Sequence, residues 1–166
     1  LKLVENVHGL EATSEYKKSL FSLPIIIEKA LARRNDIKEL AQFLSKENLI
    51  VITADGISYS LAKEACLKIK ETSYKNISAA ILGEFMHGHV AVFNNKGALI
   101  YIAVDEISKR SVSNLQKIKA DYNPKLVIIG PCSDEIKPDY NINIVCENEI
   151  QQMFADVLIC QQLALE

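Results

Sequence analysis

The chain has 166 residues, of which 49% are hydrophobic and 24% charged, and its formal net charge is −2. This length and composition predict one globular domain with an apolar core and exclude a disordered segment. The near-neutral charge gives no basic footprint for nucleic acid or an anionic membrane, and the apolar runs are far shorter than a bilayer span. We recognise no signal peptide, so we expect a cytoplasmic protein without nucleic-acid or membrane partners.

The four cysteines are scattered in apolar surroundings and lack the spacing of metal ligands; they are Cys66, Cys132, Cys146 and Cys160. This pattern predicts reduced core thiols of a cytosolic protein, with no bound metal and no cofactor. Cys132 follows a predicted strand, where a catalytic thiol is the alternative. The core thiol is favoured, because nothing in the neighbouring sequence would lower the pKa of Cys132.

In chain order, we expect residues 1–12 to be an irregular lead-in segment. Thr13 and Ser14 are good N-caps, and Pro24 can open a helical turn. One bent helix or two short helices are therefore predicted from there to about Arg33.

Asn35-Asp36 is predicted to cap a helix that runs to Ser45. Beyond it, short β-branched runs alternate with amphipathic segments, and such runs are typical of strands that are buried on both faces. The predicted strands cover residues 49–53, 77–82, 98–104, 126–130 and 142–145, with the last at or near an edge. The predicted helices cover residues 58–72, 106–120 and 151–165, and residues 90–95 are expected to form a turn or a short strand.

The alternation of strands and helices predicts an α/β fold: a flavodoxin-like parallel five-stranded sheet with helices on both faces, which is a three-layer sandwich. The last helix has a wider apolar stripe than one sheet face needs, which suggests burial against a second domain or subunit. That stripe comprises Met153, Phe154, Val157, Leu158, Leu163 and Leu165.

The turn after the first strand is a candidate binding site, because ligands of such folds bind outside the carboxyl ends of the strands. Gly56 and Ser58 lie near a helix N-terminus, where backbone N–H groups can bind a phosphate. The same residues also fit an ordinary capping turn in which Ser58 or Ser60 accepts from the first helical amides, and this interpretation is favoured. Asp55 argues against an anion at this turn.

The helix over residues 58–72 carries a second candidate site, because Glu64, Lys68 and Glu71 share one of its faces. His87 lies between glycines after the next predicted strand. A carboxylate with a histidine nearby can move a proton between adjacent carbons of a sugar. From spacing alone, a solvated helix face with weak i,i+3 and i,i+4 pairs is the more common explanation.

The run AKEACLKIKETSY, followed by GEFMHG, resembles the second sugar isomerase (SIS) domain of the glutamine–fructose-6-phosphate aminotransferase family. The resemblance covers nearly the whole chain. It implies that Glu71 is the base for transfer between sugar carbons C1 and C2, with Lys68 one turn before it. It also implies that His87 acts in ring opening and is supplied across a dimer. Ala54-Asp55-Gly56 stands where the family has Gly-Arg-Gly.

The resemblance implies a single SIS domain over residues 1–166, the C-terminal half of a double-SIS unit. We expect a sugar-phosphate isomerase or aminotransferase activity, of the type that isomerises fructose 6-phosphate and makes glucosamine 6-phosphate. The expected partners are a phosphorylated sugar and a second copy in a homodimer, and the isolated domain is expected to be inactive. Two alternatives stay open: a non-catalytic phosphosugar-binding or dimerisation module, and a related deglycase or deaminase that uses the same glutamate.

Overall fold

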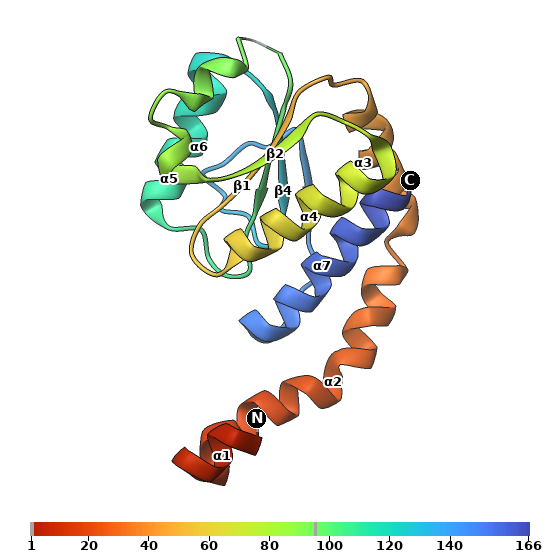
Figure 1. Ribbon diagram of the computed structural model, residues 1–166, viewed down its shortest axis with the longest axis vertical. Coiled ribbons are helices and arrows are strands. Elements are labelled where there is room, and N and C mark those ends of the chain that lie inside the picture. Colours follow the sequence, from red (N-terminus) through yellow and green to blue (C-terminus); the bar gives the residue numbers. More distant parts are fainter. Residues whose placement is uncertain (1, 95) are drawn as a thin grey trace.

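A central parallel sheet organises the chain in the computed structural model, which describes residues 2–94 and 96–166. The described residues form five strands in the order β2-β1-β3-β4-β5, and every neighbouring pair is parallel (Figure 1). The strands are β1 (Ile50–Ala54), β2 (Ile77–Ile81), β3 (Ala98–Ile102), β4 (Lys125–Ile129) and β5 (Tyr140–Ile142). The predicted five-stranded parallel sheet is confirmed.

The three central strands are almost completely buried because apolar side chains cover both of their faces. Ile52 pairs with Ile100 in register, and both face one apolar core, whereas Val51 and Leu99 pair and face the other. The alternation puts one hydrophobic core on each side of the sheet.

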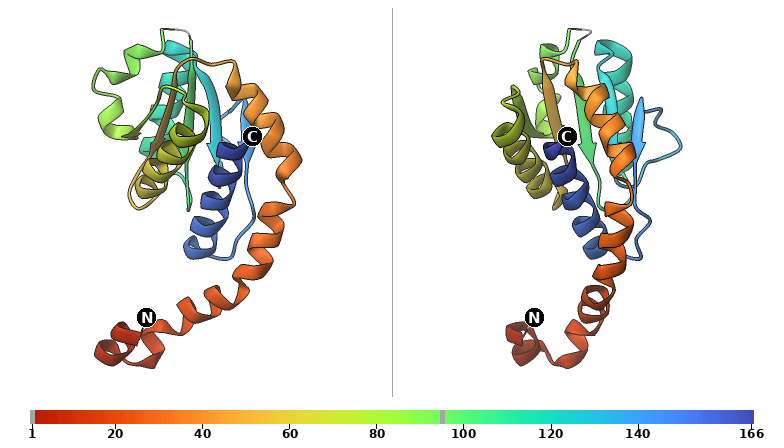
Figure 2. Two further views of the ribbon diagram at one scale, coloured as in Figure 1. Left: turned by 45° about the vertical axis from the view of Figure 1, so that its right-hand side comes forward. Right: turned by 90° about the vertical axis from the view of Figure 1, so that its right-hand side faces the viewer.

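Helices cover both faces of the sheet, so the predicted three-layer sandwich is also confirmed (Figure 2). One layer consists of α3 (Arg34–Ser45), α4 (Ser58–Ser73) and α7 (Glu149–Leu165). The other consists of the short α5 (Leu82–Phe85), the 3-10 helix η2 (His89–Val92) and α6 (Lys109–Tyr122).

The N-terminal part is helical: α1 (Lys2–His8), the 3-10 helix η1 (Leu10–Thr13) and α2 (Ser14–Leu31). The prediction of an irregular segment over residues 1–12 is therefore wrong for these helices, while residue 1 lies outside the described residues. The residues from Lys2 to His8 include neither glycine nor proline, and Gly9 separates α1 from η1 with a φ of 85°.

The predicted helix to about Arg33 is a single one, α2, which continues through Pro24 and curves along its length (Figure 1). It packs beside α7, where the Asn148 side-chain amide donates to Ser19 Oγ at 2.8 Å and the Gln151 amide donates to Ser22 Oγ at 2.7 Å. Elements α1 and η1 project beyond the sandwich (Figure 2).

Two local predictions in the connecting segments are wrong. Arg33, and not Asn35-Asp36, is the N-cap residue of α3, and Asp36 in the first turn accepts a hydrogen bond from Arg33 Nε. Residues His89–Val92 form a 3-10 helix and no strand, because Val90 and Phe93 both turn into the second core. Residue 95 lies outside the described residues.

The end of the chain differs from expectation in two ways. Strand β5 ends at Ile142 because its partner strand β4 ends at Ile129, although Ile144 stays buried. The predicted apolar stripe of α7 is also wrong, since Phe154 is 43% and Leu165 79% exposed. The buried face of α7 consists of Gln151, Gln152, Ala155, Asp156, Ile159, Cys160, Leu163 and Ala164.

Candidate functional site

The predicted catalytic pair lies at the end of α4. Lys68 Nζ is 3.0 Å from Glu71 Oε2 and 3.8 Å from Glu64 Oε1. The hydrogen bond and charge of Glu71 raise the pKa of Lys68, so this lysine stays protonated. The side chains of Lys68 and Glu71 are 37% and 52% exposed, and Glu71 lines none of the hollows found among the described residues. In one chain the pair is therefore an open surface ion pair.

His87 lies at the opposite end of strand β2 from Glu71. Glu71 precedes the first residue of β2, and His87 follows its last one by six residues. Five strand residues span roughly 13 Å at about 3.3 Å per residue, which is too far for a shared substrate atom. His87 is exposed, and β2 is an edge strand of the sheet (Figure 1). One chain therefore does not bring its own Glu71 and His87 together.

The turn that carries Gly56 and Ser58 borders a hollow of about 220 Å³. Ser58 is only 4% exposed, and its hydroxyl accepts a hydrogen bond from the Val104 backbone N–H at 3.3 Å. The expected cap by Ser58 or Ser60 is wrong, because Ile57 is the N-cap residue and no side chain caps the helix. Ser58 instead ties the start of α4 to the end of β3.

The same hollow is acidic, since Asp55, Asp105 and Glu106 line it. Asp55 Oδ2 accepts from the Tyr101 hydroxyl at 3.1 Å and from Ser111 Oγ at 2.8 Å. Burial, followed by the charge of Asp55, raises the pKa of Tyr101, which therefore stays a hydrogen-bond donor. Phosphate binding by Gly56 and Ser58 stays a prediction, and the carboxylates beside them oppose it electrostatically.

The four cysteines are free thiols, of which Cys66 and Cys160 are buried and Cys132 and Cys146 half-buried. The expected core location is confirmed for the first two alone. Burial and the charge of Asp134 raise the pKa of Cys132, so its thiolate is not favoured. Among the residues described, no group of three or more His, Cys, Asp or Glu side chains is arranged to hold a metal ion.

A buried carboxyl on α7 lies outside these predictions. Asp156 is fully buried, and its Oδ1 accepts from the Gln152 side-chain amide at 2.8 Å. Asp156 Oδ2 has no hydrogen-bond partner among the described residues. Burial raises the pKa of Asp156 to about 8, and the Gln152 hydrogen bond opposes the rise only in part. This carboxyl is therefore mostly protonated at neutral pH.

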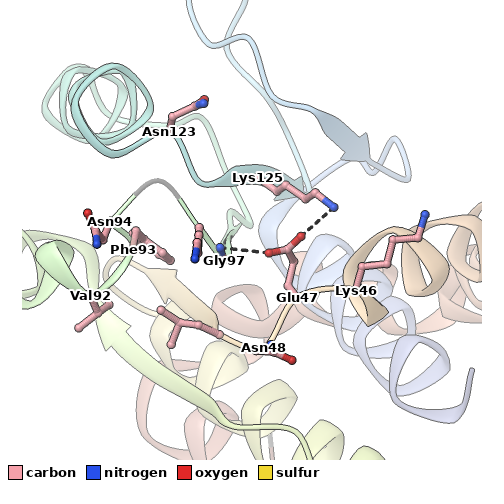
Figure 3. Close-up of a pocket in the computed structure, with 11 residues that line it drawn as sticks. Lys46, Glu47, Asn48, Val92, Phe93, Asn94, Gly97, Asn123 and Lys125 are labelled. Atoms are coloured by element: carbon pink, nitrogen blue, oxygen red, sulfur yellow. Dashed lines mark hydrogen bonds and ion pairs between the residues drawn. The ribbon is translucent and has the colours of Figure 1, made fainter.

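The largest hollow lies at the amino-terminal edge of the sheet, where no motif in the sequence predicted a site (Figure 3). This amino-edge hollow has a volume of about 640 Å³ and takes its lining from the segments that precede β1, β3 and β4. Glu47 crosses it: one carboxylate oxygen lies 2.8 Å from Lys125 Nζ, and the other accepts from the Gly97 N–H at 3.1 Å. The only signal in the sequence was a lysine near each of these strand starts, namely Lys46, Lys96 and Lys125.

Within the part of the chain that the structure describes, no helix is both long enough and apolar enough to cross a membrane.

Comparison with known proteins covers most of the chain. The family described as "SIS domain" matches residues 43–166. The glutamine–fructose-6-phosphate aminotransferase (isomerizing) of Haemophilus influenzae is 34% identical over 150 residues, which are 90% of this chain and 24% of that protein. The chain thus spans about a quarter of the length of this curated relative.

Solved structures with the same fold include two with sugar-phosphate names. The C-terminal domain of glucosamine-fructose-6-phosphate aminotransferase from Francisella tularensis has a TM-score of 0.81 at 22% identity, and the match covers 91% of this chain and 43% of that one. Glucosamine-6-phosphate deaminase from Thermotoga maritima has a TM-score of 0.63 at 15% identity, with coverage of 98% and 46%. These similarities show the fold.

Proposed function

This chain belongs to the SIS domain family, and on that basis we propose that it forms the catalytic half of a sugar-phosphate isomerase or aminotransferase. The proposed substrate is fructose 6-phosphate, and the proposed product of the intact protein is glucosamine 6-phosphate. Glu71 is the base that moves a proton between C1 and C2, and the Lys68 ammonium stabilises the negative charge that develops on the sugar oxygen. The cytoplasm is the proposed location.

The observation that carries this proposal is the position of the two motif residues along the edge strand β2. Glu71 and His87 are both exposed, and each follows or precedes that strand closely. A partner subunit that covers this edge can bring its own histidine to the glutamate of the first chain, whereas the histidine of the same chain lies too far away. We therefore propose a homodimer in which His87 acts across the interface, and an isolated domain without activity.

Replacement of the base tests the proposal in the intact protein. Glu71→Gln keeps the size of the side chain and its hydrogen bond to Lys68 but cannot take a proton. We expect isomerisation of fructose 6-phosphate to fall by about 10²–10⁴-fold, which is the usual contribution of a general base. Glu64→Gln is the matched control, because Glu64 shares the helix face and also approaches Lys68. Activity of Glu71→Gln within about tenfold of the unchanged protein would contradict a role as base.

Complementation tests the proposed contribution of His87 across the dimer. Glu71→Gln and His87→Asn subunits are each expected to be inactive on their own. In a mixed dimer, one site would combine an intact glutamate with the intact histidine of the other subunit, and activity should return on mixing. Failure to recover activity in verified mixed dimers would place the histidine elsewhere.

A second candidate is a non-catalytic module that binds a phosphorylated sugar or supports dimerisation. The acidic turn at Asp55 and the open surface position of Glu71 favour it. Calorimetry with fructose 6-phosphate separates the two, since binding without turnover in the intact protein supports the module. A deaminase or deglycase with the same glutamate predicts turnover of an amino-sugar phosphate instead.

A further inference from the structure

We propose that the amino-edge hollow binds the phosphate group of a small molecule, at a site separate from Glu71 and His87. Its position is unusual, because ligands of parallel α/β sheets generally bind at the carboxyl ends of the strands. Here the two hollows at the carboxyl ends are acidic: one is lined by Asp55 and Asp105, the other by Asp134 and Glu135, and Glu106 borders both. An anion is favoured at the opposite edge.

The charge of the amino-edge hollow is positive. Its ionisable lining residues are three lysines and Glu47. The Glu47 carboxylate is already occupied, because Lys125 pairs with one oxygen and the Gly97 N–H donates to the other. Among the described residues, neither Lys46 nor Lys96 has a carboxylate within ion-pair distance. Two ammonium groups are left to attract an anion.

The hollow also supplies neutral donors and a fixed frame. The amides of Asn48, Asn94 and Asn123 line it, and each carries N–H donors that suit phosphate oxygens (Figure 3). Glu47 holds the segment before β1 against Gly97 at the start of β3 and against Lys125 on β4, so three loops are fixed relative to one another.

The size of the hollow fits a phosphorylated metabolite. Small-molecule pockets commonly measure about 300–1,000 Å³, and this hollow, at about 640 Å³, lies within that range. Because the walls are polar and open to solvent, the binding energy comes mainly from charge-assisted hydrogen bonds to the phosphate. Binding should therefore weaken as the ionic strength rises.

The test is an NMR titration of the full chain with inorganic phosphate, followed by separate titrations with glucose 6-phosphate and succinate. We expect saturable shifts of the backbone amides of Lys96, Gly97 and Asn123, with a dissociation constant below about 10 mM. Tighter binding of glucose 6-phosphate than of free phosphate would identify a phosphomonoester as the ligand. Equal or tighter binding of succinate would overturn the preference for phosphate.

The double variant Lys46→Gln/Lys96→Gln should weaken phosphate binding by at least about tenfold, because a hydrogen bond to a charged group is worth about 1.5–3 kcal/mol. The exposed pair Lys38→Gln/Lys63→Gln removes the same charge away from the hollow and should change binding less than about threefold. Equal weakening in both double variants, or no saturable shift at the three reporter amides, would overturn the proposal. Glu71→Gln should leave these shifts unchanged, so failure of the proposed catalytic function is distinguishable from failure of this site.

Discussion

Asp156 should make the stability of this protein fall as the pH rises, and Asp156→Asn should remove that dependence. The carboxyl is fully buried on α7, and its only hydrogen bond among the described residues comes from the Gln152 amide. Burial raises its pKa to about 8 in the folded chain, against an ordinary value of 3.8 that applies in the unfolded chain. Between those two values the folded state holds a proton that the unfolded state has released.

The magnitude follows from proton linkage. Each pH unit between about 4 and about 8 lowers the free energy of unfolding by about 1.4 kcal/mol, because the unfolded state binds one proton fewer. The stabilisation from the protonated carboxyl is fully present below about pH 4 and is lost as the pH rises through about 8. At pH 7 the accumulated loss is about 4 kcal/mol, which is a large share of the 5–15 kcal/mol typical of a folded domain.

Asp156→Asn isolates this effect because asparagine has nearly the same shape, can still accept from Gln152 and does not ionise. Its unpaired N–H donors add a destabilisation of about 1–3 kcal/mol that does not change with pH. Urea unfolding followed by circular dichroism should therefore show the stability of the variant, relative to the unchanged protein, rising by about 3 kcal/mol from pH 5 to pH 7.5. Asp121→Asn, on the exposed end of α6, should show no such rise. A constant difference between Asp156→Asn and the unchanged protein over this range would refute the reasoning.

Three further predictions concern the ion pair of the amino edge, a strand end and the thiols. Glu47→Gln should lower the free energy of unfolding by about 1–2 kcal/mol in urea melts, since its half-buried lysine pair is lost, whereas the exposed Glu39→Gln should change it by less than about 0.5 kcal/mol. Gly130→Ala should destabilise by more than about 2 kcal/mol in the same assay, because its Cβ would lie 1.9 Å from a neighbouring carbonyl oxygen and the residue has a φ of 99°; a smaller loss would show that the strand ends can separate. Buried Cys160 should not react with Ellman's reagent in the folded protein, and Cys146, whose pKa burial raises to about 11, should react slowly at pH 8 and faster at pH 10. Rapid reaction of both at pH 8 would contradict their burial.

The sheet was predictable from the sequence because its central strands are continuous apolar runs with β-branched residues. Such runs fit only a strand that is covered on both faces, and β1, β3 and β4 lie within about two residues of their predicted limits. Strand β5 was displaced because alternation continues past Ile142 to Ile144, while hydrogen bonding stops where β4 ends. Burial marks a strand less sharply than pairing does.

The errors at α4 and α7 have one physical cause, which is contact between residues distant in sequence. Ser58 looks like a cap, but its hydroxyl accepts from Val104, 46 residues away. Asp156 looks like a solvent-facing residue, but α7 packs against α4 and α2 as well as the sheet, and this carboxyl lies inside. The pair of Lys68 and Glu71 was predictable because both residues lie on the same helix. The amino-edge hollow was not, since separate loops build it.

The projecting N-terminal helices divide the chain into parts of unequal cohesion. Elements α1 and η1 extend past the sandwich, and Phe21 and Ile25 on α2 are 86% and 58% exposed (Figure 2). The sheet strands open only with the whole molecule, whereas a helix with few lateral neighbours can fray on its own. Amide hydrogens of α1 should therefore exchange with solvent orders of magnitude faster than those of β1 and β3. A protease is expected to trim this end first and leave the sandwich intact.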